Sequence, residues 1–223
     1  STGAAFDGAL TALPGSSVVT PLTTLIASLV QQGQDPATAE SLVSQAFGID
    51  AAVDLSSYDP FDAATQNDTK AASVLAAGAQ VMNVMLQTAA VVDYASGKDL
   101  ASSNVSLTAA DQLASIVADT TQPLDLANDV SALSTIMSGA LSASDGAATL
   151  SAADLAAAAQ LTASVNDMMS DSLAANATNP SVIAADAARI SIVAKEAVMA
   201  AVKALELNGG TLASMSVAID STY

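Results

Sequence analysis

The chain lacks two of the residues on which most metal sites and active sites depend. It contains no Cys and no His, and its aromatic residues make up only 3% of the sequence. Without Cys there are neither disulfides nor thiolate metal sites. Without His, zinc, copper and haem sites lose their commonest ligand, and catalytic triads or dyads built on imidazole cannot form. The sequence therefore predicts a protein that is not an enzyme and carries no transition metal or organic cofactor.

Basic residues are also scarce. The chain has 22 acidic and 5 basic residues, which gives a formal net charge of -17. A charge of this sign and size repels nucleic-acid phosphates and anionic lipid surfaces. We therefore expect no nucleic-acid binding, and we expect a protein that stays soluble in a salty or calcium-containing medium, where ions screen its self-repulsion.

Hydrophobic residues make up 52% of the sequence, which excludes disorder, but many of them are Ala. A core with so few large side chains must form through close approach of helices. The most apolar stretch, residues 71–94, is interrupted by Gln80, Asn83 and Gln87. We interpret this stretch as a buried helix, and we expect no membrane insertion.

Two short amphipathic helices are predicted at residues 20–33 and 35–48. Each begins with a residue that can cap a helix, Thr20 or Asp35, followed by a proline suited to the first helical position. Each carries one apolar stripe and ends at a glycine. Together they should pack as a helical hairpin.

Residues 50–68 are predicted to form a loop, and residues 69–94 a long central helix in which Gly78 leaves room for another backbone. Later helices are predicted to begin at Thr108, near Pro123, at Ser151 and at Asn179-Pro180. The prediction is an all-α, Ala-rich bundle of about seven helices.

The chain divides into an extended lead-in (1–19), the helical bundle domain (20–210) and an extended tail (211–223). The two ends have strand-like sequences, and pairing between them would make the only sheet. Because such ends should find few partners within a bundle, we expect them to dock on a neighbouring domain or on another copy. The alternative is that they pair with each other or fray.

Four carboxylates in the predicted loop are candidate calcium ligands: Asp54, Asp59, Asp62 and Asp68. Carboxylate oxygens are the hard ligands that calcium prefers, although the spacing here does not match an EF-hand. The alternative is that these aspartates are turn and cap residues.

The methionines suggest an alternative function, the binding of a small apolar ligand. Met82 and Met85 lie on one predicted helix, and Met168 and Met169 on another, so they could line a pocket for a small apolar ligand. The alternative is that they fill the core, as Met commonly does. A hydrolase built on carboxylates and hydroxyls is a further alternative, but the sequence shows no converging set of such residues.

Part of the chain resembles a module of very large secreted or surface-attached bacterial proteins, described as adhesins or calcium-binding repeat proteins. The resemblance covers residues 1–95. It rests on Ser1-Thr2-Gly3-Ala4-Ala5-Phe6-Asp7-Gly8, Val18-Val19-Thr20-Pro21-Leu22-Thr23-Thr24-Leu25, Ala46-Phe47-Gly48-Ile49, Val53-Asp54-Leu55, Tyr58-Asp59-Pro60-Phe61 and Ala79-Gln80-Val81-Met82-Asn83.

The resemblance implies an extracellular or cell-surface location, a structural or adhesive role, and calcium-dependent neighbours. It supplies no catalytic residues. The start of the chain, Ser1-Thr2-Gly3, has no charged-then-apolar leader, so we expect any secretion signal to have been removed or to lie elsewhere in a longer protein. The leading expectation is a helical module that acts in adhesion, matrix or surface assembly through protein partners or self-association.

Overall fold

The computed structural model describes residues 8–66, 68–97, 102–144 and 150–175, together with residues 179 and 182. Over these residues the chain forms seven helices and no strand, which confirms the predicted all-α bundle. The predicted helix from Asn179-Pro180 and the predicted strand-like tail fall almost entirely outside the described residues. The helices are α1 (Pro21–Gln31), α2 (Pro36–Ala46), α3 (Pro60–Thr65), α4 (Ala71–Ser96), α5 (Ser102–Asp119), α6 (Val130–Ser144) and α7 (Ala152–Ala175).

Helices α1 and α2 begin and end where the sequence predicts. Thr20 and Asp35 are their N-caps, and each accepts a hydrogen bond from a backbone N–H in the first turn. Gly33 and Gly48 follow the helices with φ angles of 102° and 61°, a region that residues with a Cβ adopt only at a cost. The two helices pack against each other as the predicted hairpin.

The loop predicted for residues 50–68 contains a short helix, so that prediction is wrong in part. Asp59 caps α3 by accepting from the backbone N–H groups of Phe61 and Asp62. Pro60 occupies the first helical position, where its missing N–H costs nothing. The same pair of signals that begins α1 and α2, an N-cap residue followed by proline, therefore begins a third helix.

Two predicted helix starts are also wrong. Helix α5 begins at Ser102, and Thr108 lies inside it with its hydroxyl donating to the backbone oxygen of Asn104. Helix α6 begins at Val130 instead of near Pro123. Asp129 accepts from the N–H of Ala132 at the α6 start, while the residues before it fold into a turn.

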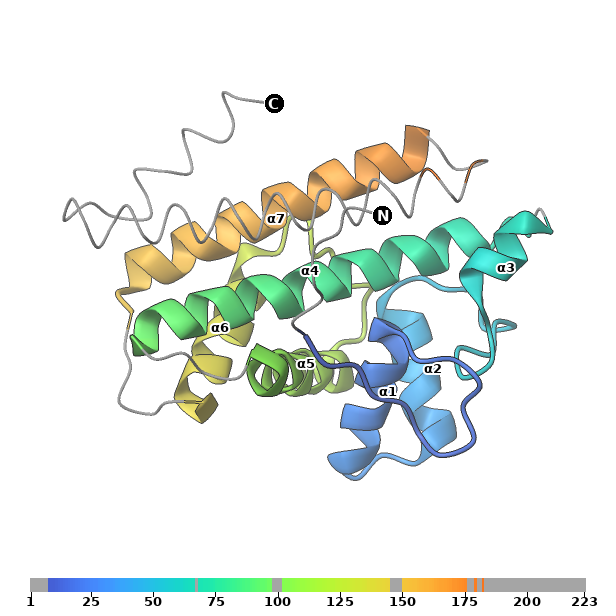
Figure 1. The fold of residues 1–223 in the computed structure, drawn as a ribbon, viewed down its shortest axis with the longest axis horizontal. Coiled ribbons are helices and arrows are strands. Elements are labelled where there is room, and N and C mark those ends of the chain that lie inside the picture. The colour runs from blue at the N-terminus through green and yellow to red at the C-terminus, as the bar shows by residue number, and fades with distance from the viewer. Residues whose placement is uncertain are drawn as a thin grey trace.

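Helix α4 is central, as predicted: it packs against α1, α3, α5, α6 and α7. Figure 1 shows it crossing the molecule with α7 beside it. By length and composition alone α4 could cross a membrane, but 72% of its most apolar window is buried inside the bundle, which fits a core helix. A Cβ built on Gly78 would meet no atom of the described residues within 4 Å, so there is room beside Gly78, but no backbone in the described part of the chain approaches it closely.

Buried polar side chains join α4 to α7, which run antiparallel. Asn83 and Asn166 are fully buried, and Nδ2 of Asn83 donates to Oδ1 of Asn166 over 2.9 Å. Nδ2 of Asn166 in turn donates over 3.0 Å to the carbonyl oxygen of Leu126, in the turn before α6. We call these two side chains and this carbonyl the asparagine network. It fixes α4, α7 and the turn before α6 against one another.

The described part of the lead-in, residues 8–19, contains no helix but is bonded to the bundle. The N–H of Ala9 donates to Oγ of Ser106 on α5, and the N–H of Thr11 donates to Oγ1 of Thr24 on α1, both over 3.0 Å. Two leucines of this segment pack against the core. The expectation that the lead-in has few partners within the bundle is therefore wrong for this part of it.

Candidate functional site

The predicted calcium ligands lie in the acidic segment, residues 50–68 between α2 and α4. Asp54 accepts from the N–H and hydroxyl of Ser56 and from the hydroxyl of Ser57. Asp59 caps α3, and Asp62 accepts from Nε2 of Gln66, the residue at the end of the same helix. These contacts are local: each joins an aspartate to a backbone or side-chain donor two to four residues away.

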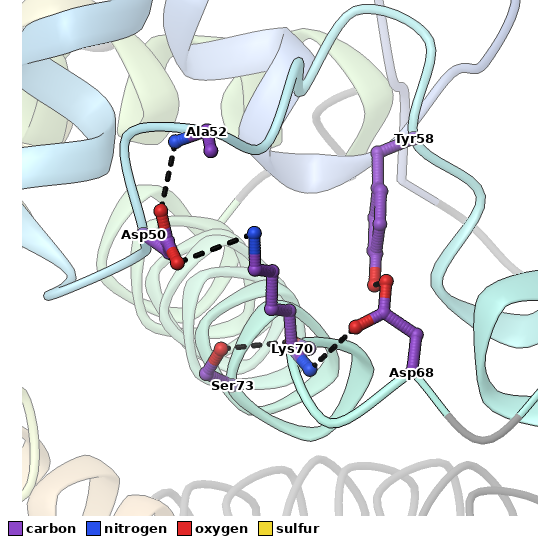
Figure 2. Close-up of polar contacts among 6 residues, drawn as sticks. All are labelled: Asp50, Ala52, Tyr58, Asp68, Lys70 and Ser73. Carbon is purple, nitrogen blue, oxygen red and sulfur yellow. Dashed lines mark hydrogen bonds and ion pairs between the residues drawn. The ribbon is translucent and has the colours of Figure 1, made fainter.

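Asp68 and Asp50 tie the acidic segment to the start of α4 (Figure 2). Asp68 accepts from the hydroxyl of Tyr58 and from the N–H of Lys70, both over 2.9 Å. Nζ of Lys70 lies 3.2 Å from Oδ2 of Asp50, whose Oδ1 accepts from the N–H of Ala52. Burial, followed by the hydrogen bond to Asp68, raises the pKa of Tyr58 to about 12. Lys70 thus holds the segment through both its backbone and its side chain.

The four predicted ligands do not gather at one point. Among the described residues, no three acidic side chains form a group that could hold a metal ion. Calcium takes about six to eight oxygen ligands, so the segment as placed offers too few at any one point. Calcium binding by Asp54, Asp59, Asp62 and Asp68 stays a prediction, and it would require the segment to rearrange.

A hollow opens instead between α2 and residues 49–54, with a volume of about 530 Å³. Of the residues that line it, Ile49 and Val53 are buried, and the alanines are exposed. Glu40 from α2 and Asp54 from the acidic segment contribute two carboxylates. We call this site the acidic hollow.

The two carboxylates of the acidic hollow are in different electrostatic states. Burial raises the pKa of Glu40; the N–H of Leu55, which donates to Glu40 Oε1, opposes that shift, and the negative charge of Asp54 adds to it. Hydrogen bonds from Ser56 and Ser57 lower the pKa of Asp54. Asp54 is therefore readily ionised, whereas the charged form of Glu40 is disfavoured.

Glu40 is not among the residues that the sequence predicts as ligands, because it belongs to a predicted helix and lies outside the segment in which the aspartates cluster. A partial signal was present. Glu40 and Ser44 are four residues apart on α2, so they share a helical face beside the apolar stripe. That this face meets Asp54 depends on how the acidic segment folds back, which the sequence does not show.

The methionines in the described part of the chain lie mainly in the core. Met85 and Met169 are 0% and 1% exposed and belong to the main hydrophobic cluster with Met137. Met82 and Met168 are half-buried. This placement favours core packing over a ligand pocket for Met85 and Met169.

Comparisons of the chain with protein-family models, with curated proteins and with solved structures found no match.

Proposed function

We propose that this chain is a non-catalytic structural module of an exported bacterial surface or matrix protein, acting through protein–protein contacts or self-assembly. One observation carries the proposal. Four of the described aspartates are used to build the fold: Asp35 and Asp59 cap helices, and Asp54 and Asp68 close turns. Side chains engaged in this way stabilise a scaffold and are poorly placed to act on a substrate.

The location rests on the resemblance alone. Residues 1–95 are similar to modules of secreted or surface-attached bacterial adhesins, and the absence of Cys and scarcity of Lys agree with that setting. The net charge of -17 supports contact with cationic partners, because opposite charge speeds association and selects against acidic surfaces.

Sedimentation velocity over a concentration series tests the proposal, with the full chain compared with a variant that lacks residues 211–223. We expect the full chain to form species larger than a monomer. Lost assembly with unchanged helicity in the truncated variant would assign the contact to the tail. A chain that stays monomeric at every concentration, and that also fails to bind whole bacterial cells, would contradict the proposal.

A hydrolase is the second candidate, because the acidic hollow pairs a carboxyl of raised pKa with a carboxylate of lowered pKa. Enzymes use such pairs as acid and base. Against this, Asp54 is held by three hydrogen bonds from Ser56 and Ser57, and Glu40 is held by Leu55. Turnover of ester, peptide or glycoside substrates that disappears in Glu40→Gln would favour the hydrolase.

A further inference from the structure

We infer that the acidic hollow receives a lysine side chain presented by a partner protein. The inference deepens the proposed function and rests on it, because it names the chemistry of one contact. Two carboxylates, Glu40 and Asp54, line a hollow that also has apolar walls. A lysine side chain complements both features, because its ammonium carries three N–H donors for the carboxylates and its methylene chain packs on apolar surface.

The described part of the chain supplies no cation of its own to this site. Lys70 is the one basic residue among the described residues, and it is paired with Asp50. Glu40 and Asp54 therefore face the hollow as two acidic groups without a basic partner among the described residues. Burial raises the pKa of Glu40 and the negative charge of Asp54 raises it further, so a cation placed beside both carboxylates would oppose that shift.

An ammonium fits better than a metal ion. Calcium needs about six to eight oxygen ligands, and no metal-holding group of three acidic side chains exists among the described residues. The hollow is open to solvent and its lining includes the apolar side chains of Ile49 and Val53, so it can accommodate an alkyl chain beside the carboxylates.

Lysine also fits better than arginine. A guanidinium pairs best with a carboxylate that presents both oxygens. Both oxygens of Asp54 already accept from serines, and Oε1 of Glu40 accepts from the N–H of Leu55. An ammonium needs only one acceptor direction from each carboxylate.

The test is an NMR titration of the isotope-labelled full chain at low ionic strength with short capped peptides. One peptide contains lysine, a second contains arginine, and a third contains norleucine, which keeps the alkyl chain without the charge. We expect the lysine peptide to shift amide signals of Ser44, Val53 and Leu55 and to bind more tightly than the other two. Glu40→Gln should weaken lysine binding about tenfold.

Asp54→Asn should weaken lysine binding by a similar factor, and it tests the second carboxylate of the hollow independently of Glu40→Gln. The matched control is Asp62→Asn, which removes the same charge from an exposed residue outside the hollow. Equal loss in Asp62→Asn would show non-specific attraction and overturn the inference. So would equal binding of the norleucine peptide, or binding of calcium chloride without binding of lysine.

The outcomes separate this inference from the proposed function. If the lysine peptide fails while the chain still assembles or binds cells, only the assignment of the hollow is overturned. If the lysine peptide binds as expected while the chain neither assembles nor binds cells, the hollow assignment holds and the proposed function fails.

Discussion

The α4–α7 interface and the acidic segment use polar side chains in opposite ways. In the interface, Asn83 bonds to Asn166, 83 residues away in the chain, and both are fully buried. In the acidic segment, Asp54 and Asp59 are exposed and bond to groups only two or three residues away. The first arrangement fixes helices against one another; the second shapes a surface.

The two regions differ in whether water can replace a hydrogen-bond partner that a substitution removes. Water cannot reach a buried amide, so removing its partner costs the desolvation of the group that remains. Water replaces a partner at an exposed carboxylate, so the loss there is small. We therefore expect stability to depend strongly on the interface, while the acidic segment stays available for contacts with other molecules.

The largest expected effect is at the asparagine network. Asn83→Leu leaves Oδ1 of Asn166 without its donor and Nε2 of Gln87 without its acceptor, both in the core. We expect the free energy of unfolding to fall by about 2–4 kcal/mol. Urea denaturation followed by circular dichroism measures it.

Two further variants sharpen that result. The double variant Asn83→Leu with Asn166→Leu removes both polar partners, so it should lose less than the sum of the single variants. Gln160→Leu, at an exposed position of α7, should change the free energy by no more than about 0.5 kcal/mol. If Asn83→Leu behaves like Gln160→Leu, the contrast between the interface and the surface is wrong.

The polar rows of this interface are visible in the sequence, but their pairing is not. Gln80, Asn83 and Gln87 are spaced three and four apart, so they share one face of α4, and Asn166 and Ser170 share one face of α7. That the rows meet depends on the antiparallel packing of two helices distant in the chain. Hydrophobic periodicity predicts each helix, whereas tertiary contacts choose its neighbour.

Local signals explain both the correct and the missed helix boundaries. Thr20 and Asp35 predicted α1 and α2 correctly because caps act on the residues directly after them. Asp59-Pro60 carries the same signal, but the helix that follows has only 6 residues, too few to show the apolar stripe that distinguishes a helix from a loop. Leu126 falls inside the helix predicted to begin near Pro123, whereas in the structure it lies in a turn and its carbonyl accepts from Asn166, a contact that no local pattern shows.

The second prediction concerns Tyr58 in the acidic segment. Tyr58→Phe removes the hydrogen bond to Asp68 from a half-buried position, and we expect a loss of about 1 kcal/mol at neutral pH. The pKa of Tyr58 is raised from 10.0 to about 12, so its contribution is present below pH 10 and is lost as the pH rises through that interval. As the pH rises from 10.0 to about 12, the free energy of unfolding should therefore fall less for Tyr58→Phe than for the parent protein. Urea denaturation at a series of pH values measures this difference. An unchanged alkaline loss would show that Tyr58 is not its cause.

A smaller effect, of opposite sign, is expected at Glu40. Burial raises its pKa above the ordinary 4.5, so its contribution is full below that pH and declines as the pH rises through the folded-state pKa. Glu40→Gln keeps an acceptor for the N–H of Leu55 without the charge. We expect its melting temperature to exceed the parent's by about 1–2 °C at neutral pH and to match it in acid. Asp62→Asn, which removes the same charge, controls for net repulsion, and a Glu40→Gln variant less stable than the parent at neutral pH would contradict the sign.

Calcium is expected to have the smallest effect of all. Asp54, Asp59, Asp62 and Asp68 each accept local hydrogen bonds and do not form a metal-holding group among the described residues, so the segment would have to rearrange for them to coordinate one ion. We therefore expect millimolar calcium to raise the melting temperature no more than matched magnesium, both ions acting by screening a net charge of -17. A rise with calcium alone, lost when Asp59 and Asp62 are both changed to Asn, would show selective binding to the native state. In that case the acidic segment, like the α4–α7 interface, would bring separated polar groups together, and the contrast between the two regions would depend on the ion.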